Sequence, residues 1–168
     1  YNKKLLGNLK NVTGIAEEVD IKTNLQLMQK LFPDRVTVLI VNGKNTLTEE
    51  KFSVIIDSVK KTIKSIEIVE TPDLSYHELA KMLLNADSKT MVLMLLYGKD
   101  KAGIELSNTE ACEFVVKDSV VPVFGVWDFQ MGTGILGGNI ISGEREGKSA
   151  AKIAVQILNG KKPDSIPV

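Results

Sequence analysis

The chain contains 168 residues, a length typical of one domain with a core of its own. Its 21 basic and 21 acidic side chains cancel, so net charge gives no reason to expect nucleic acid or an anionic membrane surface as a partner. No apolar stretch approaches the about 20 residues that cross a bilayer and the start lacks a signal-peptide core, so we expect any targeting segment of the parent protein to lie outside these residues.

The first predicted elements are a short strand at residues 11–15 and a helix that ends before Pro33. Asp20 is of a residue type that caps helix starts, and the residues after it carry apolar side chains at helical spacing. These apolar residues are Ile21, Leu25, Met28, Leu31 and Phe32.

Four short apolar runs follow, at residues 36–41, 66–69, 91–96 and 120–124. They have the pattern of strands, and the first and third are apolar enough to be buried on both faces. Helix starts of the form Ser/Thr-x-x-Glu stand between the runs, and they are Thr46 with Glu49, Ser75 with Glu78, and Ser107 with Glu110. Strands that alternate with helices predict an α/β fold with an open parallel sheet and helices on both faces.

Two glycine-containing segments resemble nucleotide-binding loops. Residues 132–137 match the G-x-G-x-x-G pattern, but that pattern belongs after the first strand of a dinucleotide-binding fold. Here it comes late and leads into residues 138–142, which have the pattern of a strand. Residues 143–149 resemble a P-loop that is one residue too short, and their carboxylates suit the first turn of a helix. We therefore expect no nucleotide and no other cofactor.

The last predicted element is a helix over residues 148–158, followed by the stop signal Asn159-Gly160. We interpret the whole chain, 1–168, as a single ligand-binding lobe with crossover segments. Its body would run from about residue 34 to 142, and the flanks 1–33 and 143–168 would lead toward a second, N-terminal lobe. Apolar surface left uncovered without that lobe predicts a homodimer or an exchange of elements between copies.

Few side chains suit catalysis or metal binding. His77 is the only histidine and lies in the first turn of a predicted helix, where we expect it to be solvated. Cys112 is the only cysteine and lies beside an apolar helix face, as a buried structural thiol does. Together they form no zinc set, and no G-x-S-x-G elbow occurs. We expect a protein without catalytic residues and without a metal.

Ligands of open parallel sheets bind beyond the carboxyl ends of the strands, which here selects the loops at residues 42–46, 70–73, 97–100 and 127–130. The last loop places the only tryptophan beside a second aromatic ring and an acid, a combination typical of small-molecule pockets. The predicted ligand-binding residues are Asn42, Asn45, Thr46, Tyr97, Gly98, Trp127, Asp128 and Phe129. For each residue alone, a role in packing or in a turn is an equal alternative.

Several segments resemble the family of substrate-binding proteins of uncharacterised ABC-type transporters. They are residues 11–14, 31–33, 121–125, 127–129, 132–138, 157–160 and 166–168. The resemblance implies a periplasmic-binding-protein-like fold, in which two Rossmann-like lobes close around a small molecule outside the cytoplasm. This chain would be the C-terminal lobe, and its loops at 42–46, 97–100 and 127–129 would line the cleft. The ligand would be an amino acid or another small organic solute.

Similar modules serve as extracytoplasmic sensor domains of bacterial signalling proteins such as sensor histidine kinases. The bulky segment at residues 127–130 is more similar to that variant than to the short acidic, Ser-rich stretch of transport members. We therefore favour a membrane-tethered sensor domain. The alternatives are the solute-binding component of an ABC transporter, a nucleotide-binding enzyme domain, and a purely structural interaction domain.

Overall fold

The structure is a computed structural model that describes residues 10–168. The chain divides into two compact units, one of Tyr1–Val19 with Ile141–Val168 and the other of Asp20–Ile140. The larger unit contains the sheet. It starts earlier than the boundary near residue 34 that the sequence predicts, because the helix that follows Asp20 buries Ile21, Leu25 and Met28.

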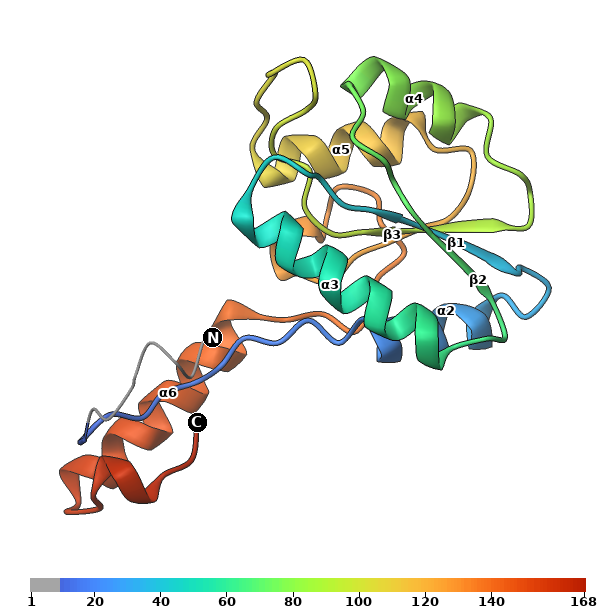
Figure 1. The fold of residues 1–168 in the computed structure, drawn as a ribbon. Helices are drawn as coiled ribbons and strands as arrows, with labels where there is room; N and C mark the ends of the chain where they lie inside the picture. The colour runs from blue at the N-terminus through green and yellow to red at the C-terminus, as the bar shows by residue number, and fades with distance from the viewer. Residues whose placement is uncertain (1–9) are drawn as a thin grey trace. The chain divides into compact units, whose positions relative to one another are not determined.

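The larger unit is a parallel sheet between two layers of helices (Figure 1). Its elements are α2 (Ile21–Leu31), β1 (Thr37–Val41), α3 (Leu47–Thr62), β2 (Glu67–Glu70), α4 (Tyr76–Leu84), β3 (Thr90–Met94), α5 (Asn108–Asp118), β4 (Val123–Phe124) and the 3₁₀ turn η1 (Asp128–Gln130). All strand pairs are parallel, in the order β2-β1-β3-β4. The predicted α/β class with an open parallel sheet and helices on both faces is confirmed.

The strand order contains a topological switch point. The chain passes from β1 to β2 on one side, then crosses back to β3 on the other side of β1. The loops after β1 and β3 therefore leave the sheet from neighbouring strands in opposite directions. In open α/β sheets this is the place where a crevice for a ligand forms.

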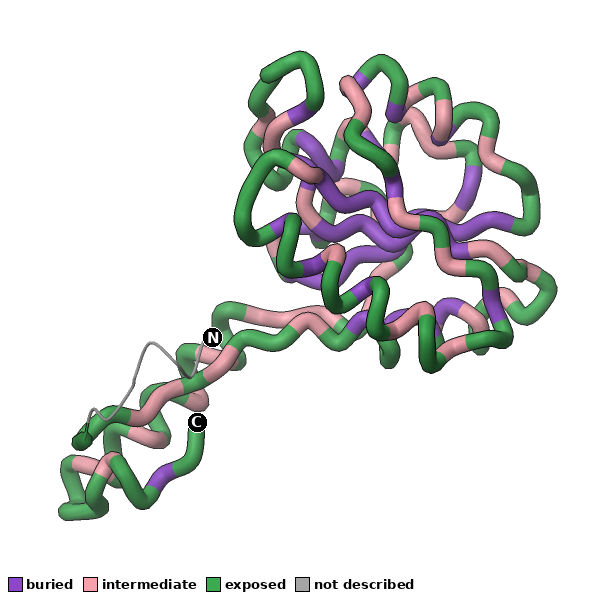
Figure 2. Tube along the Cα trace, in the orientation of Figure 1, coloured by how far each residue is buried: buried purple, intermediate pink, exposed green. Residues whose placement is uncertain are grey.

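The core consists of the two inner strands and the helix faces against them (Figure 2). Every residue of β3 is buried, and so are Val38 to Val41 of β1. Alternate residues of a strand point to opposite faces, so Leu39 and Val41 join one cluster with α4 and α5 while Val38 and Ile40 point toward α2 and α3. The prediction that the first and third runs are buried on both faces is confirmed for Val38–Val41 and for Met91–Leu95, whereas Val36 at the start of the first run is exposed.

Three differences from the predicted elements have local causes. β4 has only two residues, Val123–Phe124, since Pro122 has no N–H to donate to the sheet. Residues 138–142 form no strand, because the chain just before them pairs with β4 instead: Leu136 N donates to Val123 O at 2.8 Å and Gly125 N to Gly137 O at 3.0 Å. Residues 11–15 also form no strand.

The smaller unit contains α6 (Gly143–Leu158) and the 3₁₀ turn η2 (Pro163–Ser165). α6 begins five residues before the predicted start at 148, with Glu144 and Glu146 in its first turn, where carboxylates stabilise the positive helix end. The extended segment before Asp20 is held to the end of the chain by a hydrogen bond from Thr13 Oγ1 to Ile166 O of 2.7 Å.

Candidate functional site

The carboxyl ends of β1 and β3 lie side by side, since Val41 is paired with Met94. The loops that leave these ends include five of the predicted ligand-binding residues, Asn42, Asn45, Thr46, Tyr97 and Gly98, and the loop after β4 contains the other three. Gly43 N donates to Leu96 O at 2.7 Å, so the segments after β1 and β3 remain in contact beyond the ends of the strands. The fold thus brings the predicted loops to one edge of the sheet.

Glu49 connects the two loops at the switch point. Its side chain is 1% exposed, and its carboxylate accepts hydrogen bonds from Asn45 N at 2.9 Å and from Gly98 N at 3.4 Å. Gly43 leaves room for this carboxylate, because a Cβ at that position would lie 2.3 Å from Glu49 Oε1. A buried carboxylate that bonds to backbone N–H groups of both loops holds them in one arrangement.

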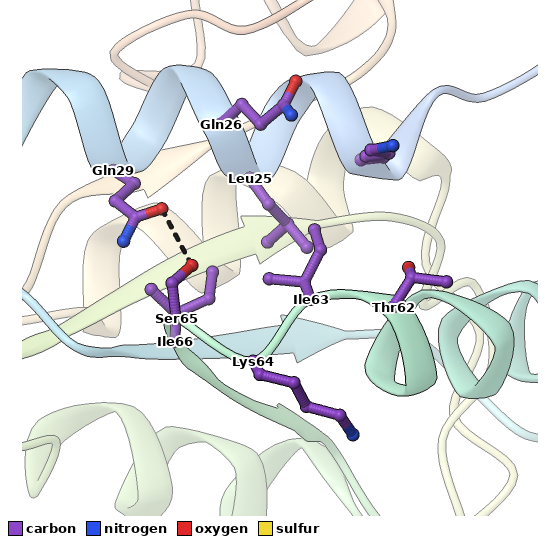
Figure 3. Close-up of a pocket in the computed structure, with 9 residues that line it drawn as sticks. Leu25, Gln26, Gln29, Thr62, Ile63, Lys64, Ser65 and Ile66 are labelled. Carbon is purple, nitrogen blue, oxygen red and sulfur yellow. Dashed lines mark hydrogen bonds between the residues drawn. The ribbon is translucent and has the colours of Figure 1, made fainter.

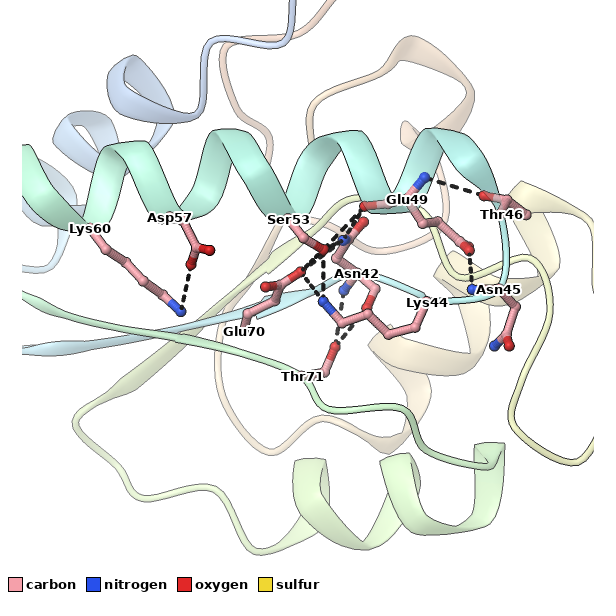
Figure 4. A network of polar contacts seen from close by, with 10 residues as sticks. All are labelled: Asn42, Lys44, Asn45, Thr46, Glu49, Ser53, Asp57, Lys60, Glu70 and Thr71. Carbon is pink, nitrogen blue, oxygen red and sulfur yellow. Dashed lines mark hydrogen bonds and ion pairs between the residues drawn. The ribbon is translucent and has the colours of Figure 1, made fainter.

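Asn42 is the buried centre of a polar network (Figure 4). Its Nδ2 donates to Glu49 O and to Glu70 Oε1, both at 2.9 Å, and its backbone exchanges hydrogen bonds with the Thr71 hydroxyl. Its Oδ1 is buried and has no hydrogen-bond partner among the described residues. Such an orphan buried acceptor is a place for an ordered water or a ligand donor.

Lys44 and Glu70 form an ion pair in the same network, and Ser53 donates to Glu70 Oε1 at 2.7 Å (Figure 4). Burial raises the pKa of Glu70, but hydrogen bonds from Lys44, Asn42 and Ser53 lower it more, so that the pKa lies below its ordinary value. Glu70 therefore remains ionised and holds the loop after β1 against the end of β2.

Tyr97 points into the core rather than toward solvent. It is 1% exposed, packs edge-on against Tyr76, and its hydroxyl donates to Leu74 O at 2.8 Å. Burial raises the pKa of Tyr97 to about 12. Its side chain thus supports the loop at residues 97–100 from the core side.

The loop after β4 carries a group of aromatic rings. Trp127 is stacked on Phe129, with ring centroids 5.6 Å apart and an interplanar angle of 15°, and meets the edge of Phe52 of α3 at 5.7 Å. Trp127 is buried while Phe129 is partly exposed and Asp128 exposed. Trp127 thus anchors a loop whose tip, at Asp128 and Phe129, remains accessible.

The predicted site residues therefore fall into two groups. Asn45, Thr46, Gly98, Asp128 and Phe129 have accessible surface, whereas the side chains of Asn42, Tyr97 and Trp127 are buried. Sequence reasoning missed Glu49 and Gln130, which organise the loops. The Thr46/Glu49 pair was visible only as a helix start, and nothing in the sequence indicates that Gln130 is buried.

The glycine-rich segment and the lone cysteine have structural roles in the larger unit. Gly134 has φ +107°, and a Cβ on Gly138 would lie 2.0 Å from Gly125 O, so these glycines allow a turn and a close backbone approach beside β4. Cys112 is buried, as predicted, with Thr133 Oγ1 at 3.3 Å from its sulfur. Within residues 10–168 no group of three or more His, Cys, Asp and Glu side chains could hold a metal ion.

A separate cavity of about 310 Å³ lies between α2 and the link from α3 to β2 (Figure 3). Leu25, Ile63 and Ile66 form its apolar walls, and Ser65 Oγ donates to Gln29 Oε1 at its rim at 3.2 Å. The cavity lies at the amino ends of the strands. It is therefore distinct from the carboxyl edge of the sheet, where the four predicted loops lie.

The comparisons with known proteins identify the family. The family model of ABC transporter substrate binding proteins matches residues 3–168. The chain belongs to this family. A search of curated proteins found no match.

Solved structures show the same fold at low sequence identity. A ligand-free, open substrate-binding protein with adhesive properties from Clostridium difficile is 18% identical with a TM-score of 0.69, covering 96% of this chain and 55% of its own. A conserved domain protein from Vibrio cholerae O1 biovar El Tor is 19% identical with a TM-score of 0.62, covering 95% and 52%. An ABC domain from Streptococcus pneumoniae in complex with L-Trp is 19% identical with a TM-score of 0.58, covering 94% and 52%. This chain spans about half the length of each neighbour.

No helix in the described part of the chain is long and apolar enough to cross a membrane.

Proposed function

We propose that this substrate-binding-family chain is the C-terminal lobe of an extracytoplasmic solute-binding protein that serves an ABC transporter. A small organic solute binds at the carboxyl edge of the sheet and is enclosed by a second lobe. The observation that carries the proposal is the switch point, where Glu49 joins the loops after β1 and β3 beside the Trp127–Phe129 stack. No chemical step is needed, since a ligand that favours the closed arrangement shifts the population toward it.

The sensor-domain hypothesis from the sequence takes second place. The family match, the neighbour described as a substrate-binding protein and the ABC domain in complex with L-Trp support a transporter component at least as well, and no comparison supports a histidine kinase. The aromatic segment at Trp127 remains the one feature in favour of a sensor. The coding sequence on both sides of residues 1–168 separates the two: a lipoprotein cysteine upstream fits a transporter component, and a transmembrane helix downstream fits a sensor.

L-Tryptophan is the first ligand to test, because one neighbour of the same fold holds it. We expect ¹⁵N-labelled chain to show saturable shifts of the backbone amides of Asn45, Gly98 and Trp127 with L-tryptophan or another member of a panel of amino acids, purines and small organic acids. The amides of Lys64 and Ser65, at the opposite edge of the sheet, serve as an internal control and should not move.

A pair of matched variants tests the role of the loop tip. Asp128→Asn should weaken binding about 10-fold, as expected for the loss of a charged hydrogen-bond partner worth about 1.4 kcal/mol. Asp57→Asn removes an exposed acid from α3 and should change nothing. A panel that shifts no amide at the carboxyl edge at millimolar concentration would exclude the proposed site.

A further inference from the structure

Gln130 is a buried polar residue that is not among the predicted ligand-binding residues. It ends the 3₁₀ turn η1 and is 0% exposed. A side-chain amide has two N–H donors and two acceptor lone pairs, and burying them without partners would be costly. The partners of these two donors and two lone pairs therefore show what Gln130 does.

The amide of Gln130 lies between the ends of two strands. Its Nε2 donates to Met94 O and to Leu95 O, each at 3.2 Å, at the carboxyl end of β3. Its Oε1 accepts from Val126 N at 2.7 Å and from Trp127 N at 3.0 Å, in the chain that continues β4. All four hydrogen-bonding positions of the amide are thus occupied by backbone groups.

This arrangement replaces the sheet ladder at its last rungs. β3 and β4 pair through Val92 with Val123 and Leu93 with Phe124, and the ladder then stops. Beyond the ladder, the Gln130 amide lies between the carbonyl groups of the segment after β3 and the N–H groups of the segment after β4. The inserted amide therefore takes the place of direct pairing between these two segments, at the edge of the sheet where the candidate site lies.

The same side chain determines where Trp127 lies. Trp127 N donates to Gln130 Oε1, and Gln130 N donates back to Trp127 O at 3.1 Å, so the backbone of Trp127 is held on both sides. Gly125 makes this possible, because a Cβ there would lie 2.5 Å from Gln130 Oε1. With its backbone held, the indole ring is directed against Phe52 and Phe129.

We infer that Gln130 is the positioning residue of the candidate site: its amide separates β3 from β4 and sets the Trp127–Phe129 stack beside the switch point. The relevance to ligand binding rests on the proposed function, whereas the placement of Trp127 by Gln130 can be tested without any ligand. Trp127 is the only tryptophan in the sequence, so fluorescence excited at wavelengths that the tyrosines do not absorb reports on this ring alone.

The test uses Gln130→Glu, which has the same shape but a donor only when it is protonated. A carboxylate there would face the carbonyl groups of Met94 and Leu95, and burial would raise its pKa above the usual range. We expect the Trp127 emission maximum to be red-shifted and acrylamide quenching to increase at least 2-fold at pH 8. Both should return toward the wild-type values as the pH falls to 5, while wild type and Gln26→Glu, an exposed amide on α2, show no such transition.

A second measurement covers the case in which the variant does not fold. In the wild-type chain, the side-chain NH₂ of Gln130 should exchange with solvent at least 100-fold more slowly than that of Gln26. Equal exchange rates, or a folded Gln130→Glu chain with wild-type fluorescence at pH 8, would overturn the inference. Failure of the wild-type chain to bind any member of the ligand panel would leave it standing and count only against the proposed function.

Discussion

Buried polar side chains determine the shape of the candidate site. Asn42, Glu49 and Gln130 are each at most 1% exposed. Glu49 and Gln130 bond to backbone groups that are distant in sequence, and Asn42 bonds to the side chains of Glu70 and Thr71. Buried polar groups are stable only when such partners exist. A single sequence shows the residue types but not the partners, so Asn42 could be read equally well as a ligand contact or as a turn residue.

Glu70 makes stability depend on pH in a definite direction. Its pKa lies below the ordinary 4.5 in the folded chain, so the stabilisation is present above that value and is lost as the pH falls below it. Glu70→Gln should lower the free energy of unfolding at pH 7 by removing the ion pair with Lys44, and should make its decline between about pH 5 and 3 less steep. Urea unfolding at a series of pH values measures both effects.

The control for this change is Glu50→Gln, which replaces an exposed carboxylate of α3. It should leave the pH dependence as in wild type. A decline in Glu70→Gln as steep as that of the wild-type chain would contradict the assignment.

At the scale of the elements, three helix starts with the same sequence pattern behave differently. α4 and α5 begin with complete capping boxes, Ser75 with Glu78 and Ser107 with Glu110. At α3 the Thr46 hydroxyl caps Glu49 N, but the Glu49 carboxylate bonds to Asn45 N and Gly98 N instead. The pattern predicted each helix start correctly, and the tertiary structure gave one of the three carboxylates a second role.

This difference predicts unequal effects of the same substitution. Glu49→Ala leaves two backbone N–H groups of the switch-point loops without their buried acceptor, so we expect a loss of about 2 kcal/mol in the free energy of unfolding. Glu110→Ala, at the exposed start of α5, should cost much less. Chemical denaturation of both variants measures the difference, and equal losses would show that Glu49 acts only as a helix cap.

At the scale of the whole molecule, the two units differ in how well they are packed. The larger unit surrounds its inner strands with helices (Figures 1 and 2), whereas no residue of α6 in the smaller unit is buried. α6 nevertheless carries an apolar stripe, which consists of Ala150, Ile153, Ala154, Ile157 and Leu158. A long helix with an unburied apolar stripe is typical of a surface that packs against a further domain or a second protein molecule.

The homodimer predicted from the sequence remains a prediction, since no comparison supports it. If the α6 stripe drives association, light scattering should give a mass above the 18.4 kDa of one chain. Leu158→Glu should then lower the measured mass to that of the monomer. Leu158 is 85% exposed. Val54→Glu, at a residue of α3 that is 71% exposed, should leave the association unchanged. A monodisperse wild-type monomer at high concentration would contradict the prediction.

The sequence by itself determined the fold class, the alternation of strands and helices from β1 to β4, and the three helix starts after β1, β2 and β3; the edge of the sheet at which a ligand binds stays a prediction. These features follow from local periodicity and capping chemistry, which neighbouring residues specify. The tertiary structure alone decided that residues 138–142 form no strand, that Tyr97 points into the core, and that Glu49 and Gln130 hold the loops. Those outcomes depend on hydrogen-bond partners that are distant in the sequence: Glu49 accepts from Gly98 N, and Gln130 donates to Met94 O. Such contacts exist only once the sheet has formed.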